Sequence, residues 1–290
     1  MQRVSLLALI AAGALVLAGC GSTSEPDPAP EPGGNATADA ASCEKDQLPL
    51  FADGELTIAT DKPAYPPWFI DNDPTNGKGF ESAVAYAVAE ELGFSEDEVT
   101  WVVEPFNKSY APGPKKYDFD INQISITAKR EEAVDFSEGY YDVNQALVAL
   151  KDSPLAEVSS IEELKSFKLG AQVGTTSYAY ITQYVQPEEQ PFTYDNTNDA
   201  KSALNAGQID GIVLDLPTAF YVTAVEIPNS AVVGQFPSQG ETEQFGLLFE
   251  EDSPLVDCVN EAIAALEEDG TLDRIQQEWL SDAVSAPVLE

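Results

Sequence analysis

Apolar and polar positions follow two alternating patterns along the chain from about residue 54 onward. Short apolar or alternating runs predict strands at residues 56–60, 99–103, 118–123, 146–150, 169–173, 209–214 and 245–249. Segments with helical spacing predict helices at residues 83–92, 161–167, 174–184, 199–207, 254–268 and 272–280, and one more that begins at Pro217. Strands that alternate with helices favour an α/β fold with largely parallel sheets, in which ligands bind beyond the carboxyl ends of the strands.

The first 19 residues have the pattern of a secretory signal. Arg3 is followed by an apolar run at residues 6–17, which is shorter than the roughly 20 residues of a membrane-spanning helix. The run ends in LAGC at residues 17–20, which resembles a bacterial lipobox. We therefore expect residues 1–19 to be a lipoprotein signal peptide and Cys20 to become a lipidated N-terminus, since two or more acyl chains anchor a protein stably. An ordinary signal peptide with an incidental cysteine is the alternative.

Residues 20–42 differ in composition from the rest of the chain. After Cys20 this segment holds four prolines, four acidic residues and no basic one, and its other apolar side chains are all alanines. Such a segment buries too little apolar surface to fold, and its like charges repel one another. We expect a disordered acidic tether that carries a folded body beginning at Cys43.

Two cysteines remain once Cys20 is lipidated, Cys43 and Cys258. Outside the cytoplasm an even remainder favours a disulfide, here between the start of the body and a helix near its end. Two buried free thiols are the alternative.

Charge and composition exclude several classes of function. The 290 residues include 50 Asp and Glu but only 14 Lys and Arg, which gives a formal charge of −36. This balance excludes a basic nucleic-acid-binding surface and disfavours adhesion to anionic lipid. The absence of histidine excludes His-ligated zinc and Ser-His or Cys-His catalysis, and three cysteines are too few for a four-thiolate zinc site. We therefore expect neither a metal nor a cofactor. The chain is long enough for one large domain or two lobes.

Short motifs occur in a fixed order along the body. They are Asp61 with YPPW at residues 65–68, GFE at 79–81, KYD at 116–118, SITAKR at 125–130, VDFS at 134–137, YY at 140–141, GTT at 174–176, DGIVLD at 210–215, DGTL at 269–272 and WL at 279–280. In this order they resemble the bacterial extracellular solute-binding proteins of the polar amino-acid family, the receptor subunits of ABC importers. The resemblance spans residues 56–280.

The resemblance implies an α/β, two-lobed fold of the type II periplasmic-binding-protein kind, with a ligand cleft between lobes joined by two hinge crossings. We expect the first lobe at residues 43–149 and 247–290 and the second at 150–246, with hinges near 147–150 and 246–249. The resemblance also implies an extracytoplasmic, lipid-anchored protein that captures a free amino acid and delivers it to an ABC permease with its ATPase. Nothing in the sequence points to an oligomer, so we expect a monomer.

A free amino acid carries two opposite charges, and a dry cleft must pair both because an unpaired buried charge is costly. The resemblance implies that Arg130 binds the α-carboxylate through its planar fork, and a surface arginine paired with Glu131 or Glu132 is the alternative. It implies that Asp215, at a strand end, accepts from the α-ammonium, and a strand-end turn residue is the alternative. Thr176 is expected to donate to the carboxylate from a helix start, where simple capping is the alternative. Further contacts are expected from Asn122, Gln123 and Ser125.

Selectivity for the ligand side chain is expected to depend on a second set of residues. Tyr65 and Phe106 resemble the aromatic walls of the family, and Trp68 is a further candidate for which core packing is the alternative. Two acidic residues, Asp61 and Asp120, are candidates to face a cationic or amide side chain, and internal hydrogen bonds are the alternative. Asp120 stands in a position that is commonly apolar in the family. We therefore expect a polar or basic amino acid.

Two other classes of function remain as alternatives. Some relatives of this fold are enzymes acting on small carboxylic acids, and Glu81, Asp61 and Asp215 are the candidate acid–base residues. The sequence specifies neither a nucleophile nor an oxyanion hole for such an enzyme. A sensor-type ligand-binding module would need a transmembrane or kinase segment after the body, and this sequence ends at Glu290.

Overall fold

The computed structural model describes residues 43–280 and 286–290. Its strands are β1 (Leu56–Thr60), β2 (Val99–Val103), β3 (Phe119–Asp120), β4 (Asp135–Val143), β5 (Gln145–Leu150), β6 (Leu169–Gln172), β7 (Phe192–Tyr194), β8 (Gly211–Asp215), β9 (Ser230–Gln235) and β10 (Glu243–Phe249). Its α-helices are α1 (Phe80–Glu91), α2 (Phe106–Ser109), α3 (Thr176–Tyr180), α4 (Thr197–Asn205), α5 (Leu216–Tyr221), α6 (Val256–Glu268) and α7 (Thr271–Trp279). Helices α3 and α5 each continue into a single π-helical turn, at Ile181–Val185 and Val222–Glu226.

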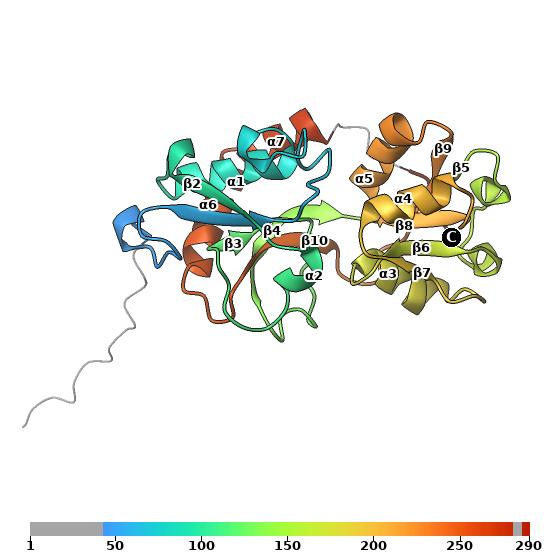
Figure 1. Cartoon of the computed structure of the whole chain (residues 1–290), viewed down its shortest axis with the longest axis horizontal. Helices are drawn as coiled ribbons and strands as arrows, with labels where there is room; N and C mark the ends of the chain where they lie inside the picture. The colour runs from blue at the N-terminus through green and yellow to red at the C-terminus, as the bar shows by residue number, and fades with distance from the viewer. Residues whose placement is uncertain (1–42, 281–285) are drawn as a thin grey trace, which may run out of the picture. The chain divides into compact units, whose positions relative to one another are not determined.

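The strands form two five-stranded sheets, which lie in separate lobes (Figure 1). The first lobe is built on the order β2-β1-β3-β10-β4 and the second on β7-β6-β8-β5-β9. The predicted two-lobed α/β architecture is thus confirmed. The sheets are mixed, however, and not largely parallel as predicted. Strand β10 runs antiparallel to β3 and β4, and β5 runs antiparallel to β8 and β9, because both strands enter their sheet from the other lobe.

Burial on both faces explains why the central strands are continuously apolar. In β5, Ala146 and Val148 pack on one face against α4 and α5, while Leu147 and Ala149 pack on the opposite face against α3. In the first lobe, α1, α6 and α7 cover one face of the sheet, and α2 lies over the other. Each lobe therefore has its own core, and the carboxyl ends of the parallel strands remain available for a site.

The crossings between lobes lie elsewhere than predicted. Because β5 belongs to the second sheet and β10 to the first, the chain changes lobe at Asn144 and again within residues 236–242. The predicted hinges at 147–150 and 246–249 are therefore strands inside a sheet. The C-terminal residues, assigned to the first lobe, pack on the second: Leu289 is buried in its core and Val288 bridges Gln235.

Three further strands were not predicted, namely β4, β7 and β9. Polar residues interrupt β4, which has exposed Glu138 and Asp142 between buried positions, so its pattern is weak. The predicted helix at 161–167 is a 3-10 helix at Glu162–Ser166. The predicted strand at 118–123 is reduced to β3, because the chain after Asp120 turns into the loop that forms part of the site.

The predicted disulfide between Cys43 and Cys258 is present, with an S–S distance of 2.05 Å. It attaches the start of the described chain to α6 in the first lobe. The predicted signal peptide, lipidated Cys20 and acidic tether lie outside the described residues. Within the described part of the chain, no helix has the length and apolar character needed to cross a membrane.

Asp120 is a carboxyl group enclosed in the first lobe. It is 0% exposed, and neither of its carboxylate oxygens has a hydrogen-bond partner among the described residues. Burial raises the pKa of Asp120 to about 8, so the group is mainly uncharged at neutral pH. Because the pKa of Asp120 is higher in the folded than in the unfolded protein, folding favours the protonated carboxyl group. Its contribution to the free energy of unfolding is fully present below about pH 4 and is lost as the pH rises toward 8.

We predict that Asp120→Asn makes the free energy of unfolding less dependent on pH. Relative to the unchanged protein, the variant should gain roughly 1 kcal/mol per pH unit between pH 5 and 8, because Asn has no proton to lose. Urea unfolding of the ligand-free protein at several pH values measures this. Asp97→Asn, which removes an exposed acid, is the control; parallel stability curves for Asp120→Asn and the unchanged protein would contradict the prediction.

Candidate functional site

A polar cavity lies between the two lobes, where parallel strands end. Asp61 directly follows β1, while Gln172 and Asp215 are the last residues of β6 and β8. The residues that line the cavity are Asp61, Tyr65, Phe106, Asn122, Gln123, Ser125, Arg130, Gln172, Thr175, Thr176, Thr197 and Asp215. Every predicted ligand-binding residue except Trp68 and Asp120 is among them. Both lobes therefore contribute to one site.

A glycine contact fixes the start of α1 beside this site. Gly79 has a φ of 99°, and a Cβ atom at this position would lie 2.4 Å from the carbonyl oxygen of Trp68. Only glycine allows this approach, which lets the N–H groups of Phe80 and Glu81 donate to the carbonyls of Pro67 and Trp68. The GFE motif thus directs the Glu81 side chain into the lobe.

Glu81 holds the loop that carries several cavity residues. Its carboxylate is 0% exposed and accepts hydrogen bonds from Tyr140 Oη at 2.6 Å, from the N–H of Gln123 at 2.6 Å and from Gln123 Nε2. These bonds stabilise Gln123 at a positive φ of 48°. Burial raises the pKa of Glu81 to about 7. Neither Glu81 nor Asp120 lines the cavity, so Glu81 is not placed for acid–base work there and Asp120 is not placed for selectivity.

Arg130 lies at the junction of the lobes with its side chain 8% exposed. Its Nη1 donates to the carbonyl of Ser125 at 2.5 Å, and its Nη2 donates to the carbonyl of Gly174 in the second lobe at 3.1 Å. The guanidinium also lies 5.5 Å from the ring centre of Phe106 and 4.9 Å from that of Tyr110. Among the described residues no carboxylate forms a salt bridge with it. The alternative of a surface pair with Glu131 or Glu132 is therefore not what the structure shows.

The second lobe presents Thr176 and Asp215 to the same cavity. Thr176 is the first residue of α3, and the cap is supplied by Thr175, whose Oγ1 accepts from the N–H of Tyr178 at 3.1 Å. The Thr176 hydroxyl is thus free of the capping role and lies 3.3 Å from Ser125 Oγ. Asp215 accepts from Gln145 Nε2 at 2.8 Å. Burial, followed by the neighbouring charge of Glu243, raises the pKa of Asp215 to about 7.

Asp61, Tyr65 and Phe106 form another part of the lining. The carboxylate of Asp61 accepts from the backbone N–H of Phe106 at 3.2 Å and of Lys62 at 2.6 Å. Burial raises the pKa of Tyr65 to about 12, so its hydroxyl remains a donor. A carboxylate has acceptor capacity beyond two bonds, so Asp61 can still bind a donor in the cavity.

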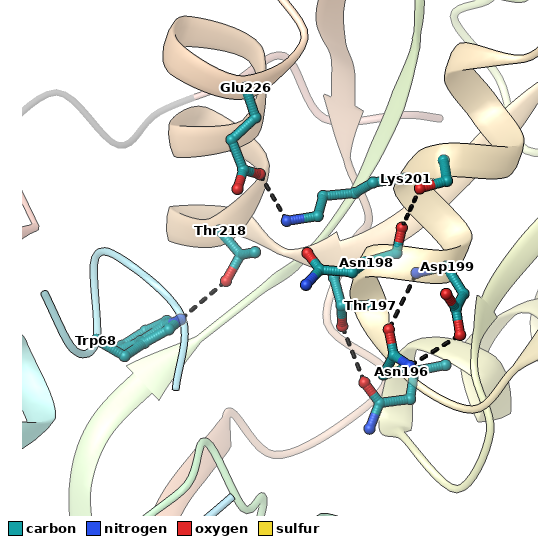
Figure 2. A network of polar contacts seen from close by, with 10 residues as sticks. Trp68, Asn196, Thr197, Asn198, Asp199, Lys201, Thr218 and Glu226 are labelled. Carbon is teal, nitrogen blue, oxygen red and sulfur yellow. Dashed lines mark hydrogen bonds and ion pairs between the residues drawn. The ribbon is translucent and has the colours of Figure 1, made fainter. Parts of the chain in front are cut away.

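Lys201 of the second lobe lies against the ring of Tyr65, outside the cavity lining. Its Nζ is 5.1 Å from the Tyr65 ring centre and 2.7 Å from Glu226 Oε2, as part of the network in Figure 2. Lys201 does not line the cavity, and its charge is neutralised by Glu226. Among the described residues that line the cavity, Arg130 is therefore the one cation, against the carboxylates of Asp61 and Asp215.

Trp68 does not face the cavity, contrary to the sequence expectation. Its side chain is 0% exposed and packs edge-on against Phe80, Tyr141 and Phe245 in the first core. Its indole Nε1 donates to Thr218 Oγ1 in the second lobe at 2.9 Å (Figure 2). The alternative of core packing is thus correct for Trp68, with an added polar contact between lobes.

Three lining residues were missed by sequence reasoning, namely Gln172, Thr175 and Thr197. Thr197 Oγ1 donates to Gln172 Oε1 at 2.9 Å, and α4 begins at Thr197 after a cap from Asn196. Gln172 ends an apolar strand, and because ligands bind at the carboxyl ends of strands, the sequence could have predicted it as a site residue. In the sequence Thr197 is recognisable only as the start of a helix, and it reaches the cavity because of the way in which the second lobe folds. The described part of the chain has no cluster of three or more potential metal ligands.

Comparison with known proteins adds an independent observation. A family model described as bacterial extracellular solute-binding proteins, family 3, matches residues 56–282. An L-cystine-binding protein of Escherichia coli (strain K12) is 28% identical over 222 residues, 76% of this chain and 81% of that protein. The glutamine-binding protein of an ABC transporter of Bacillus subtilis (strain 168) is 27% identical over 289 residues, 97% of this chain and 98% of its own.

A solved structure shows the same architecture. An ancestral arginine-binding protein bound to glutamine has a TM-score of 0.67 and 28% identity, covering 80% of this chain and 100% of its own. This likeness confirms the predicted type II periplasmic-binding-protein fold. The matched residues include both sheets and all the residues that line the cavity. The chain therefore belongs to the bacterial extracellular solute-binding proteins of family 3.

Proposed function

We propose that this protein captures a free amino acid between its lobes and delivers it to an ABC permease. The observation that carries the proposal is the buried guanidinium of Arg130, which makes no salt bridge within the described residues. An unpaired buried cation is costly, and an α-carboxylate in the cavity would remove this cost through two parallel charge-assisted bonds. Asp215 offers the opposite charge to the α-ammonium from the other lobe.

We infer a polar or basic side chain on the ligand from the charges left in the cavity. Once Arg130 and Asp215 pair with the two backbone charges of the ligand, the remaining lining charge is Asp61. A guanidinium, ammonium or amide group donates to a carboxylate, and the rings of Tyr65 and Phe106 are suited to packing against a planar cation. No lining cation remains for an acidic side chain, so glutamate is disfavoured. The arginine- and glutamine-binding relatives support this class.

The proposal requires no chemistry on the ligand. Of the three acid–base candidates, Glu81 is fully engaged in holding the Gln123 loop, and the pairing of Arg130 with Asp215 suits binding of a zwitterion. We further propose that Cys20 is lipidated, that residues 20–42 form a tether, and that the protein acts as a monomer outside the cytoplasm. The lipobox-like sequence and the acidic, proline-rich composition support these points.

We predict that the ligand-free protein binds arginine and glutamine more tightly than glutamate, and that Arg130→Ala weakens binding at least about 100-fold. Removing one partner of a buried charge pair costs several kcal/mol, and 1.4 kcal/mol is a factor of ten. Isothermal titration calorimetry with each of the twenty amino acids measures this, after bound ligand is removed by partial unfolding. Arg274→Ala, which removes an exposed arginine from α7, is the control. Tightest binding of glutamate, or full affinity in Arg130→Ala, would contradict the proposal.

The bond between Trp68 and Thr218 links ligand binding to the contact between lobes. A ligand that touches both lobes favours their close arrangement, and interlobe bonds contribute to the stability of that arrangement. We predict that Thr218→Val raises the dissociation constant about tenfold, because the indole N–H then remains unpaired when the lobes meet. Thr223→Val is the matched control, since Thr223 donates to Phe220 within the same lobe.

The midpoint of thermal unfolding without ligand should stay almost unchanged in Thr218→Val, because each lobe keeps its own core. Equal affinities of Thr218→Val and Thr223→Val would show that the Trp68 bond plays no part in ligand capture.

A further inference from the structure

Glu243 is a carboxylate next to the cavity, and the sequence motifs predicted no role for it. It is the first residue of β10, directly after the segment at 236–242 that crosses between the lobes. Its Oε1 accepts from Ser125 Oγ of the first lobe at 2.6 Å. Its two oxygens lie 3.3 and 3.2 Å from Nε2 of Gln145, which begins β5 in the second lobe. One side chain on a crossing strand thus contacts both lobes.

Gln145 connects Glu243 with Asp215. The amide is 3% exposed, its Oε1 accepts from Ser177 Oγ at 2.5 Å, and its Nε2 donates to Asp215 at 2.8 Å. An amide nitrogen has two N–H groups, so Gln145 Nε2 can donate one to Asp215 and the other to Glu243. Ser177 and Glu243 therefore fix the orientation in which Gln145 presents a donor to Asp215.

The same arrangement brings two carboxyl groups to one amide group. The titratable groups that face Asp215 are Glu243 from β10, Glu81 from α1, Tyr140 and Tyr141 from β4, and Arg130. The carboxylates disfavour a charge on Asp215, whereas Arg130 and the Gln145 hydrogen bond favour it.

We propose that Glu243 is a positioning residue of the ammonium subsite, which holds Gln145 against Asp215 and places a second carboxylate beside that subsite. The inference rests on the proposed function, because it takes Asp215 as the acceptor for the α-ammonium. The pKa of about 7 for Asp215 agrees with it, since burial and then Glu243 are the main causes of the increase.

A dependence of ligand affinity on pH follows from this arrangement. Only ionised Asp215 pairs with an ammonium, so binding releases a proton from the protonated fraction. Affinity should therefore fall as the pH drops below about 7, approaching tenfold per pH unit at the acidic end. In Glu243→Gln the loss of the neighbouring charge should move this midpoint about one pH unit lower.

The experiment compares arginine affinity by calorimetry from pH 5 to 8.5 in the unchanged protein, Glu243→Gln and Glu241→Gln. Glu241 is an exposed acid two residues earlier that makes no hydrogen bond to Gln145, so its variant removes the same charge and is the matched control. We expect Glu243→Gln to bind several-fold more tightly than the unchanged protein at pH 5.5 and within about threefold of it at pH 8.5. The control should follow the unchanged protein throughout.

A second measurement does not depend on the ligand. Carbon-13 NMR of the Asp215 carboxyl in the ligand-free protein, assigned by its loss in Asp215→Asn, reports the titration directly. The midpoint should be lower in Glu243→Gln than in the unchanged protein. An Asp215 midpoint that is the same in both proteins would overturn the proposal. Full affinity for arginine in Asp215→Asn would instead overturn the proposed function, so the two failures are distinguishable.

Glu243→Asp separates position from charge. It keeps the carboxylate but shortens the side chain by one methylene, so it loses its reach to Ser125 and Gln145. A positioning role predicts arginine affinity about three- to tenfold weaker at pH 8.5, where Asp215 is ionised in every variant. Unchanged affinity of Glu243→Asp at that pH would show that Glu243 does not position the subsite.

Discussion

A buried guanidinium that has no carboxylate partner among the described residues is the constraint on which the rest of the site depends. Arg130 is held by carbonyl oxygens of Ser125 and Gly174, which come from different lobes, and by the rings of Phe106 and Tyr110. Carbonyl dipoles and aromatic faces orient the charge but do not neutralise it. In the proposed function a bound carboxylate neutralises it, which would make ligand binding and the contact between lobes a single event.

Residues of both lobes help to hold this junction. In the first lobe Gly79 sets the start of α1, and Glu81 then fixes the loop that leads to Ser125. In the second lobe Gly174 has a φ of 79°, and a Cβ atom there would lie 2.3 Å from the hydroxyl of Tyr110. A larger residue at Gly174 would thus displace the side chains of Tyr110 and Asn107 and strain the backbone at the point where Arg130 binds its carbonyl.

The sequence predicted the structure well where a short run of neighbouring residues decides it. The strands β1, β2, β6 and β8 are apolar or β-branched runs, and Asp61 and Asp215 follow from their carboxyl ends. Trp68 was misplaced because an aromatic residue has the same local pattern in a core as in a cavity wall. The crossing at Asn144 was missed because Gln145, a polar residue, is buried by a network of distant partners. Glu243 and Thr197 likewise gain their positions from the assembled lobes.

The most direct test of the central claim is the distance between the lobes as ligand is added. Spin labels at Glu91→Cys on α1 and Gln208→Cys after α4, with Cys20 changed to Ser, report this distance by pulsed electron paramagnetic resonance. If an amino acid is clamped by Arg130 and Asp215, arginine should narrow the distribution toward the shorter distance, and Arg130→Ala should abolish the change. Binding of arginine at full affinity with an unchanged distribution would contradict the mechanism.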